Sequence, residues 1–355
     1  MTSRELVMEA FAHRATPQVP KWFGSSPEFI EKACAELGLA DEEALRVRLG
    51  DDFRRVGSRW KGPAHTLSPG ATWVSPFGVE RTGLFYGEPT SHPLEGKWEL
   101  SDLEAYPWPD PLWAEVSHIR ADAERLKDPS GGNYAILGGE WAPYWHDAID
   151  LVGMENLYFL MYDRPEYVDA LLGRINGYYL AVSERIFEAA GDLIDISFIG
   201  NDFGGQTGPL LGPELFDRFL KPHLARHAEL AHRYGKKLML HCCGGFRPLV
   251  PSIIAAGVDA LHALQPDCTG MGGAGLKKDF GDLVVLNGGI DSRLVLIDGT
   301  PDLVRQRTRE ILDLMTPGGG FIAGASHDFI LPETPVENVV AMFDTILEYK
   351  VEIGI

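Results

Sequence analysis

The sequence predicts a single (β/α)8 barrel, and three observations carry that prediction. Short apolar runs of three to five residues recur from about residue 134 onward, and helical patterns separate them. Within each run the apolar residues are continuous rather than alternating, as in parallel strands that are covered on both faces. No Gly-x-Gly-x-x-Gly follows the first run, which disfavours a dinucleotide-binding sheet. At least six strand–helix units therefore favour a closed barrel.

The elements follow in order along the chain. We expect strands at residues 134–137, 195–199, 237–241, 260–264, 283–286 and 321–323. We expect helices at residues 164–190, 213–234 and 246–257, followed by two that open at Thr300-Pro301 and Thr334-Pro335. Asp163 with Glu166, and Thr334 with Glu337, have the spacing of capping boxes. Pro222 should kink the helix that contains it.

Residues 58–112 interrupt the alternation, because they are rich in Pro, Gly and Trp. We interpret this stretch as an excursion with short strands over one mouth of the barrel. Enlarged barrels exceed 250 residues, so residues 1–355 are expected to form one domain.

Charge and cysteine usage restrict the classes of partner. The chain has 32 basic and 51 acidic residues, a formal net charge of -19, so nucleic acid and anionic membranes are expected to be repelled. No apolar stretch reaches the roughly 18 residues of a membrane span. The N-terminus lacks the apolar region of a signal peptide, and four cysteines make no disulfide framework. We therefore expect a cytoplasmic protein without membrane or nucleic-acid partners.

The most informative stretch is the end of the strand at 237–241. His241 and Cys243 are two residues apart on an extended segment, so their side chains point the same way and Cys242 points away. In a barrel the carboxyl ends of strands build the active site, and imidazole with thiolate is a zinc-type ligand set. The alternative is a buried cysteine pair with a hydrogen-bonded core histidine.

Polar residues also follow the last strand. His327 or Asp328 could complete a three-ligand metal site, although Asp328 could equally cap the next helix. Asp202 and Gln206 follow the strand at 195–199 and could orient a substrate or act as acid or base, unless they only form a polar turn.

Three further strand ends carry candidate ligand-binding residues. Asn287 and Asp291 flank glycines that allow close approach to a ligand, with helix capping by Asp291 as the alternative. Glu140 and Trp141 could form one wall of a pocket, although packing under the excursion is the preferred role for the aromatic residues there. Cys268 is expected to be a small buried residue rather than a ligand.

The chain resembles the uroporphyrinogen decarboxylase superfamily, which includes corrinoid-dependent methyltransferases. Val19–Trp22 is similar to the first strand of that family, so the resemblance covers most of the chain and implies a (β/α)8 barrel. The other segments that carry it are His241-Cys242-Cys243-Gly244, Ala256-Gly257-Val258-Asp259, Asn287-Gly288-Gly289-Ile290-Asp291 and Pro332-Glu333-Thr334-Pro335-Val336-Glu337-Asn338.

The resemblance is closer to the methyltransferase branch, typified by methylcobamide:coenzyme M methyltransferases. True decarboxylases carry an arginine-rich motif after the first Pro-x-Trp, whereas residues 22–27 contain no arginine. A strongly acidic protein without that motif is a poor receptor for a polycarboxylate.

The resemblance implies one zinc ion. The methyltransferases bind zinc through His-x-Cys and a later Cys; His241 and Cys243 match, but the last strand end has no Cys. His327 is the expected replacement, ahead of Asp328 and Ser326. Imidazole in place of thiolate makes zinc a stronger Lewis acid, which suits an ether oxygen.

The implied reaction moves a methyl group between a small substrate, with a methyl ether favoured, and a corrinoid. The corrinoid could bind transiently or be carried by a corrinoid-binding partner protein. Asp202 and Gln206 would orient the substrate and Trp141 would flank it. The alternatives are a metal-free lyase that acts on a carboxylated substrate with Asp202 as its acid–base group, and a barrel that only binds a ligand. The oligomeric state stays open.

Overall fold

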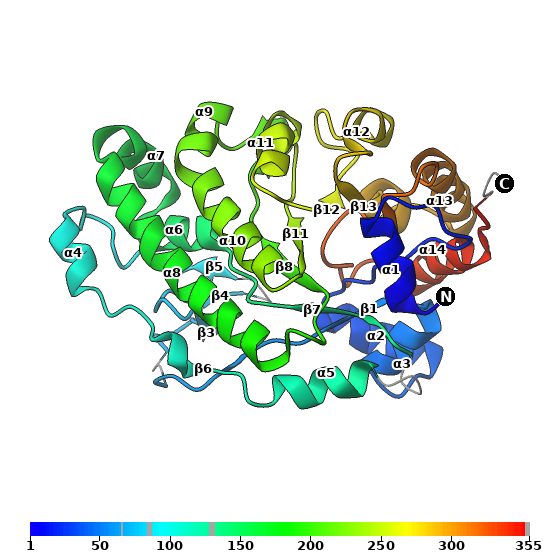
Figure 1. The fold of residues 1–355 in the computed structure, drawn as a ribbon, viewed down its shortest axis with the longest axis horizontal. Helices are drawn as coiled ribbons and strands as arrows, with labels where there is room; N and C mark the ends of the chain where they lie inside the picture. Colours follow the sequence, from blue (N-terminus) through cyan, green and yellow to red (C-terminus); the bar gives the residue numbers. More distant parts are fainter. Residues whose placement is uncertain (65–66, 84–86, 128–131, 352–355) are drawn as a thin grey trace.

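The computed structural model describes residues 1–64, 67–83, 87–127 and 132–351. Its central sheet has seven parallel strands, ordered in space as they are in the sequence (Figure 1). The strands are β1 (Phe53–Arg55), β7 (Ala135–Gly138), β8 (Ile196–Gly200), β11 (Lys237–His241), β12 (Ala260–Leu264), β13 (Val285–Ile290) and β14 (Phe321–Ala325). The six expected strands are therefore confirmed, with ends that differ by a few residues.

The segment around Lys21 fills the eighth position and closes the barrel. Lys21 pairs with Ala323 of β14 in a parallel bridge, and the Trp22 N–H donates to the carbonyl of Ala323 (2.9 Å). On the other side, the Asp52 N–H donates to the carbonyl of Lys21 (3.1 Å), next to β1. The expected (β/α)8 barrel is confirmed.

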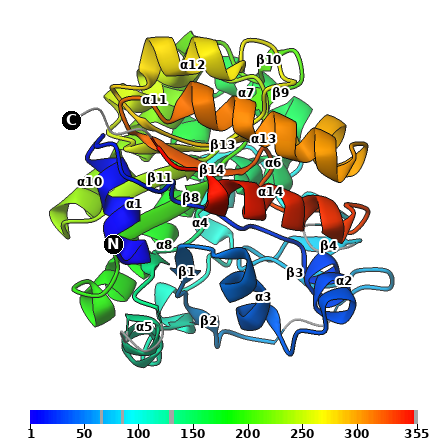
Figure 2. The same cartoon turned by 90° about the vertical axis from the view of Figure 1, so that its right-hand side faces the viewer.

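Helices surround the strands, as Figures 1 and 2 show. They include α2 (Pro27–Leu37), α3 (Glu42–Leu49), α5 (Ile119–Lys127), α6 (Tyr144–Val152), α7 (Met154–Asp163), α8 (Pro165–Ala190), α10 (Lys221–Arg233), α11 (Val250–Ala255), α12 (Gly273–Phe280), α13 (Pro301–Met315) and α14 (Val336–Glu348). Shorter segments are α9 (Pro213–Leu215), η3 (Phe216–Leu220), η4 (Arg247–Leu249), η5 (Ser292–Ile297) and the β9–β10 hairpin (Gly204–Gly205, Gly208–Pro209). Among the described residues, no helix combines the length and apolarity that crossing a bilayer would require.

The two expected capping boxes, at Asp163 and at Thr334, are wrong, whereas the expected helix start at Thr300 is confirmed. Asp163 is the last residue of α7, so it cannot also precede α8, which follows Arg164 without a side-chain cap. Thr334 lies one residue too early, because Pro335 occupies the cap position of α14. Thr300 does cap α13, by accepting from the Leu303 N–H. The expected helix at 213–234 contains the wider π-type turn η3 just before Pro222.

The excursion leaves the carboxyl end of β1 and packs on the flank that α6 and α8 form. Phe77 contacts the rings of Tyr178 and Tyr179 (5.5 and 5.6 Å between centroids), and the Leu94 N–H donates to the carbonyl of Leu151. Its residues 65–66 and 84–86 lie outside the described residues. Its elements are β2 (Arg59–Trp60), β3 (Trp73–Val74), β4 (Glu80–Thr82), β5 (Glu88–Pro89), α4 (Leu100–Ala105) and η1 (Pro111–Trp113), and β6 (Ala114–Glu115) then pairs with β2.

The barrel interior is layered. One helix, α1 (Ser3–Phe11), packs Val7 and Phe11 against the inward-facing apolar residues of the barrel. Those apolar residues are Trp22, Phe53, Ala135, Leu137, Ile196, Phe198, Met239, Ala260, Val285 and Ile322. The next inward positions toward the carboxyl ends include Arg55 and His241. This change from apolar to polar side chains places the candidate site at the carboxyl-terminal mouth.

Candidate active site

His241 and Cys243 meet at the end of β11. Their Nε2 and Sγ atoms are 3.3 Å apart, as the alternation of side chains along an extended segment predicts. Cys242 points away into the core, where its sulfur accepts from the Phe203 N–H (3.3 Å) and burial raises the pKa of its thiol well above the ordinary value. Of the two adjacent cysteines, Cys243 is therefore the one that faces the site.

Asp202 lies beside this pair, in the loop after β8. Its Oδ1 accepts from the Cys243 N–H (2.7 Å) and is 3.4 Å from His241 Nε2. Burial by itself raises the pKa of Asp202, but its hydrogen bonds with His146 and His241 outweigh burial and hold the pKa well below its ordinary value. Asp202 is therefore an anion at neutral pH, so it can orient donors or attract a cation but is a poor proton donor.

His327, in the loop after β14, reaches the same sulfur. It hydrogen bonds with Cys243, and its Nδ1 lies 3.1 Å from the backbone nitrogen of Phe329. Burial by itself raises the pKa of Cys243, but the charge of His241 and the hydrogen bonds with both histidines outweigh it, so the pKa is lowered. Burial lowers the pKa of His241, but the negative charges of Cys243 and Asp328 raise it well above its ordinary value. These shifts favour a thiolate at Cys243 and an imidazolium at His241, which carry opposite charges.

His262 lies next to His241, on the neighbouring strand β12. The two residues pair in the β11–β12 register, and their Nδ1 atoms are 3.2 Å apart. Asp328 Oδ1 lies 3.9 Å from His262 Nδ1, and His262 is fully buried. Burial, reinforced by the charges of His241 and His327, lowers the pKa of His262 well below its ordinary value, so this ring is neutral and can accept a hydrogen bond from His241.

Glu140 and Trp141 follow β7, and Asn287 lies on β13. The Ser58 hydroxyl, at the start of the excursion, donates to the carboxylate of Glu140. The Trp141 ring lies 5.5 Å from the His241 ring, centroid to centroid. Asn287 is fully buried; its Nδ2 is 3.6 Å from Met239 Sδ, and its Oδ1 has no partner among the described residues.

Asp291 and Gln206 lie farther round the mouth. Asp291 caps η5 by accepting from the Arg293 and Leu294 N–H groups (2.9 and 2.7 Å), the role considered as its alternative. Gln206 is exposed, and its amide donates to the carbonyl of Asp267 (3.3 Å). Ser326 accepts from the Ser292 N–H (2.9 Å), so its hydroxyl is directed away from Cys243. The structure therefore brings together His241, Cys243, His327 and Asp202, but not Asp291 or Ser326.

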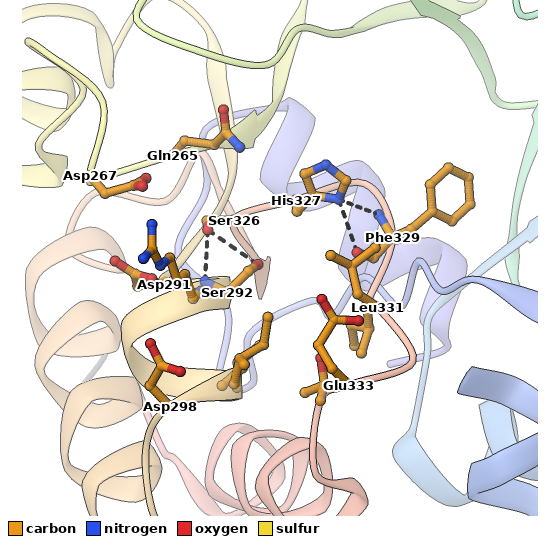
Figure 3. Close-up of a pocket in the computed structure, with 15 residues that line it drawn as sticks. Gln265, Asp267, Asp291, Ser292, Asp298, Ser326, His327, Phe329, Leu331 and Glu333 are labelled. Carbon is orange, nitrogen blue, oxygen red and sulfur yellow. Dashed lines mark hydrogen bonds between the residues drawn. The ribbon is translucent and has the colours of Figure 1, made fainter. Parts of the chain in front are cut away.

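A cavity of about 380 Å³ lies beside His327 (Figure 3). We call it the acidic cavity, because its lining includes the carboxylates of Asp267, Asp291, Asp298 and Glu333. The figure shows His327 on one side of this cavity and Asp267, Asp291 and Asp298 on the other. Arg293 is the basic residue of its lining.

The donor set fits a tetrahedral metal ion. Adjacent nitrogen and sulfur ligands of tetrahedral zinc are separated by about 3.5 Å, given bonds of about 2.0 and 2.3 Å, and His241 Nε2 and Cys243 Sγ are 3.3 Å apart. Ligand atoms of Asp202, His241 and Cys243 all lie within 4.8 Å of one another, as do those of His241, His262 and Asp328. Each of these two groups supplies three donors, the number that a catalytic zinc site uses. The two groups share only His241, and His327 belongs to neither of them.

Two residues of this group, His262 and His146, are not predicted from the sequence. His262 lies inside an apolar strand, where a histidine is easily attributed to the core. The available signal was its place in the register, because it and His241 face the same side of neighbouring strands. His146 lies on α6, and only the fold brings it to Asp202, whose N–H donates to its Nε2 (3.0 Å).

Comparisons with known proteins agree with the fold. Uroporphyrinogen decarboxylase of Coxiella burnetii (strain RSA 493 / Nine Mile phase I) is 24% identical over 196 residues, which are 54% of this chain and 50% of that protein. The chain thus spans about half the length of the curated decarboxylases that it matches. A methylated-thiol–coenzyme M methyltransferase of Methanosarcina mazei is 24% identical over 260 residues, which are 73% of this chain and 65% of that protein.

A solved structure and a family model extend the comparison. The structure of a methyltransferase from Methanosarcina mazei superposes with a TM-score of 0.70 over 98% of this chain and 99% of that one, at 18% identity, which is a likeness of fold. The family model described as uroporphyrinogen decarboxylase (URO-D) matches residues 90–349, well over half of the chain. The chain therefore belongs to the uroporphyrinogen decarboxylase family.

Proposed function

We propose that this protein is a zinc-dependent methyltransferase that moves a methyl group between a small methylated substrate, a methyl ether in first place, and a corrinoid. The corrinoid would bind transiently or be carried by a partner protein, and the reaction would take place in the cytoplasm. The observation that supports the proposal is the 3.3 Å approach of His241 Nε2 to Cys243 Sγ at the barrel mouth, where His327 hydrogen bonds with the same thiol. The proposal is also supported by a relative that is named as a methyltransferase, the methylated-thiol–coenzyme M methyltransferase of Methanosarcina mazei.

His241, Cys243 and His327 would hold the zinc ion and leave one position open. When bound, the zinc supplies a Lewis acid for the heteroatom that carries the methyl group. Cys243 is suited to this role because its lowered thiol pKa favours the thiolate, which is the form that binds metal. Asp328, the second choice for the third ligand, lies beside His262.

The other residues orient these ligands and the substrate. Asp202 holds the Cys243 backbone through a 2.7 Å hydrogen bond, which fixes the direction of the thiol. The Trp141 ring lies 5.5 Å from the His241 ring, tilted by 30°, and would flank the substrate with an apolar surface. Glu140 and Asn287 are proposed to contact the substrate, and so is Asp291 at the acidic cavity. Gln206 is proposed to orient the substrate together with Asp202 at the barrel mouth.

The methyl-transfer assay tests this proposal. Purified protein is mixed with cob(I)alamin and a panel of methyl ethers and methyl thioethers, and methylation of the corrinoid is followed by its absorbance. We expect turnover with at least one ether by the wild type, and a loss of about 100-fold or more in Cys243→Ser. Cys268→Ser is the matched control, because the Cys268 sulfur lies 3.8 Å from the side-chain oxygens of Gln206 and Gln265 and is not among the proposed zinc ligands. No methylation with any donor would contradict the proposal.

A lyase that releases carbon dioxide from a carboxylated substrate is the second candidate, because the family includes decarboxylases. In that reaction Asp202 would be the acid–base group, but its lowered pKa leaves it as a carboxylate at neutral pH, without a proton to donate. The lyase predicts carbon dioxide release that persists in the presence of a chelator. Loss of all activity in the chelator would exclude it.

A further inference from the structure

Asn287 is a buried amide that the barrel places next to the proposed zinc ligands. It lies on β13, two residues after Val285 of the apolar interior layer, so its side chain points into the barrel. His262 on β12 and His241 on β11 each follow a member of that layer by two residues in the same way. Since β11, β12 and β13 are neighbours in that order, the three polar side chains lie side by side in one layer, with His262 in the middle.

Three neighbours determine how the His262 ring lies. The rings of Trp22 and Phe198 pack against it, with centroids 4.6 and 5.4 Å away. Its Nδ1 lies 3.2 Å from Nδ1 of His241, with which it is paired in the β11–β12 register. Because Nδ1 is turned toward His241, the second ring nitrogen, Nε2, is directed away from it. On the other side of β12, the polar side chain of the same layer is that of Asn287.

The contact between the two histidines determines which nitrogen of His262 carries a proton. Of two ring nitrogens at hydrogen-bond distance, one must donate and the other must accept. His241 turns Nε2 toward Cys243, at 3.3 Å, and as a metal ligand through Nε2 it carries its proton on Nδ1. His262 Nδ1 therefore accepts from His241, and the neutral ring of His262 carries its own proton on Nε2.

A donor and an acceptor on neighbouring strands are thus both left to be satisfied. His262 Nε2 is the donor, and it has no hydrogen-bond partner among the described residues. Asn287 Oδ1 is the acceptor, and within the same part of the chain it has none either, while its Nδ2 lies 3.6 Å from Met239 Sδ. Both residues are fully buried. Buried polar groups are generally paired, and an enclosed water molecule often joins two of them. A water that accepts from Nε2 and donates to Oδ1 satisfies both atoms.

We propose that Asn287 is a positioning residue for the zinc ligand His241, and that it acts on His262 through one enclosed water molecule. This inference rests on the proposed zinc-dependent function, and it gives Asn287 a role in addition to the proposed substrate contact. Without the acceptor at Asn287, the tautomer of His262 that carries its proton on Nδ1 becomes competitive. That tautomer requires His241 Nδ1 to accept, which moves the His241 proton to Nε2, the atom that faces Cys243.

Asn338 offers a matched comparison on another element. It lies on α14, is 1% exposed, and its Oδ1 likewise has no hydrogen-bond partner among the described residues. Its Nδ2 donates to the carbonyls of Leu296 and Gly299, at 2.9 Å each. Replacing Asn338 therefore removes an equally buried amide from a place that neither His262 nor His241 contacts.

Nuclear magnetic resonance of ¹⁵N-histidine-labelled protein tests the inference without requiring turnover. Wild type, Asn287→Leu, Asn287→Asp and Asn338→Leu are compared, and the His262 signals are identified by their loss in His262→Gln. We expect wild-type His262 to be protonated on Nε2 alone, with a downfield Nε2–H signal that shows a hydrogen bond. Asn287→Leu has a similar size but no acceptor, so this signal should move upfield and zinc affinity should fall by about 10-fold. Asn287→Asp keeps an acceptor and should retain the downfield signal, as should Asn338→Leu.

Wild-type His262 with its proton on Nδ1 would overturn the inference, and this result needs no variant to fold. An Asn287→Leu protein whose Nε2–H signal and zinc affinity match those of the wild type would overturn it as well, and so would an equal change in Asn338→Leu. Absence of zinc binding, with a His262 signal that still depends on Asn287, would instead overturn the proposed function and leave the contact between Asn287 and His262 established.

Discussion

At the scale of single residues, the contact between His241 and His262 determines which nitrogen faces the cysteine. His262 Nδ1 lies 3.2 Å from His241 Nδ1, while His241 Nε2 lies 3.3 Å from Cys243 Sγ. A metal-ligating histidine normally donates its second ring N–H to a fixed acceptor, which sets the tautomer. The neutral ring of His262 is such an acceptor, and it is fully buried.

Replacing His262 should therefore weaken zinc binding without removing a ligand. We expect His262→Phe to lower zinc affinity by about 10- to 100-fold, the usual cost of losing such a partner. His262→Gln keeps an acceptor and should recover part of the loss. Zinc affinity is measured by competition with a chromophoric chelator, and thermal unfolding confirms that both variants fold. Equal affinity in wild type and His262→Phe would contradict this role.

The sequence predicts His241 and Cys243 because ligand types two residues apart on a strand must share a face. It does not predict His262 in the same way, since the neighbours of His262 on β12 are apolar and its partner is 21 residues away. Asp202 is predicted only as a candidate. Its contact with the Cys243 N–H depends on how the β8 and β11 loops meet.

At the scale of elements, a buried carboxyl group joins α6 to α8. The Tyr179 hydroxyl of α8 donates to Asp147 of α6 (2.6 Å), and Asp147 is 5% exposed. Burial raises the pKa of Asp147 to about 6, although the hydrogen bond from Tyr179 and the charges of His146 and Arg81 oppose that rise. This joint lies under the excursion, whose Phe77 contacts Tyr179.

The raised pKa predicts a pH-dependent stability at this joint. Between about pH 4 and pH 6 the unfolded chain releases the Asp147 proton while the folded chain retains it, so stability falls as pH rises. Asp147→Asn cannot ionise, so the wild type should lose up to about 3 kcal/mol relative to it across this range. Denaturant unfolding at several pH values measures the difference. Asp302→Asn, which removes a 97% exposed carboxylate, is the control and should change little. A pH-independent difference between wild type and Asp147→Asn would contradict the prediction.

Helix ends were harder to predict than strands. The strands at 237–241 and 260–264 agree with the apolar runs, because burial on both faces leaves a strong pattern. The Asp163 capping box failed because α7 and α8 are separated only by Arg164, so the residue that could cap one helix ends the other. The spacing of Asp163 and Glu166 alone cannot show that another helix, α7, ends at Asp163.

At the scale of the whole molecule, a buried ion pair joins the two ends of the sheet. Lys21 Nζ lies 3.0 Å from Asp52 Oδ2, with both side chains about 95% buried, and the Lys21 N–H donates to the same oxygen (2.8 Å). Ser3 donates to Oδ1 (2.6 Å), so α1 is fixed to the same carboxylate. The resemblance implies eight strand positions, but only the paired backbone shows that the segment around Lys21 occupies the eighth.

Removing this carboxylate should destabilise the closed barrel strongly. Asp52→Ala leaves the Lys21 ammonium buried without its partner, and we expect a loss of about 3–5 kcal/mol in the free energy of unfolding. The surface pair Arg48–Asp344 has a similar length (2.8 Å) but is 41% exposed on both sides, so Asp344→Ala should cost at most about 1 kcal/mol. Denaturant unfolding compares the two. Equal losses would show that Asp52 does not contribute to closure.

The proposed function requires His241, Cys243 and His327 to hold one zinc ion together. Zinc content tests this requirement, measured by mass spectrometry on protein purified from zinc-replete medium and dialysed, for wild type, His241→Ala, Cys243→Ser, His327→Ala and Cys268→Ser. We expect about one zinc ion per chain in wild type and Cys268→Ser, and a small fraction of that in the other three. A wild type without stoichiometric zinc, or a Cys243→Ser variant that retains it, would rule out this zinc site.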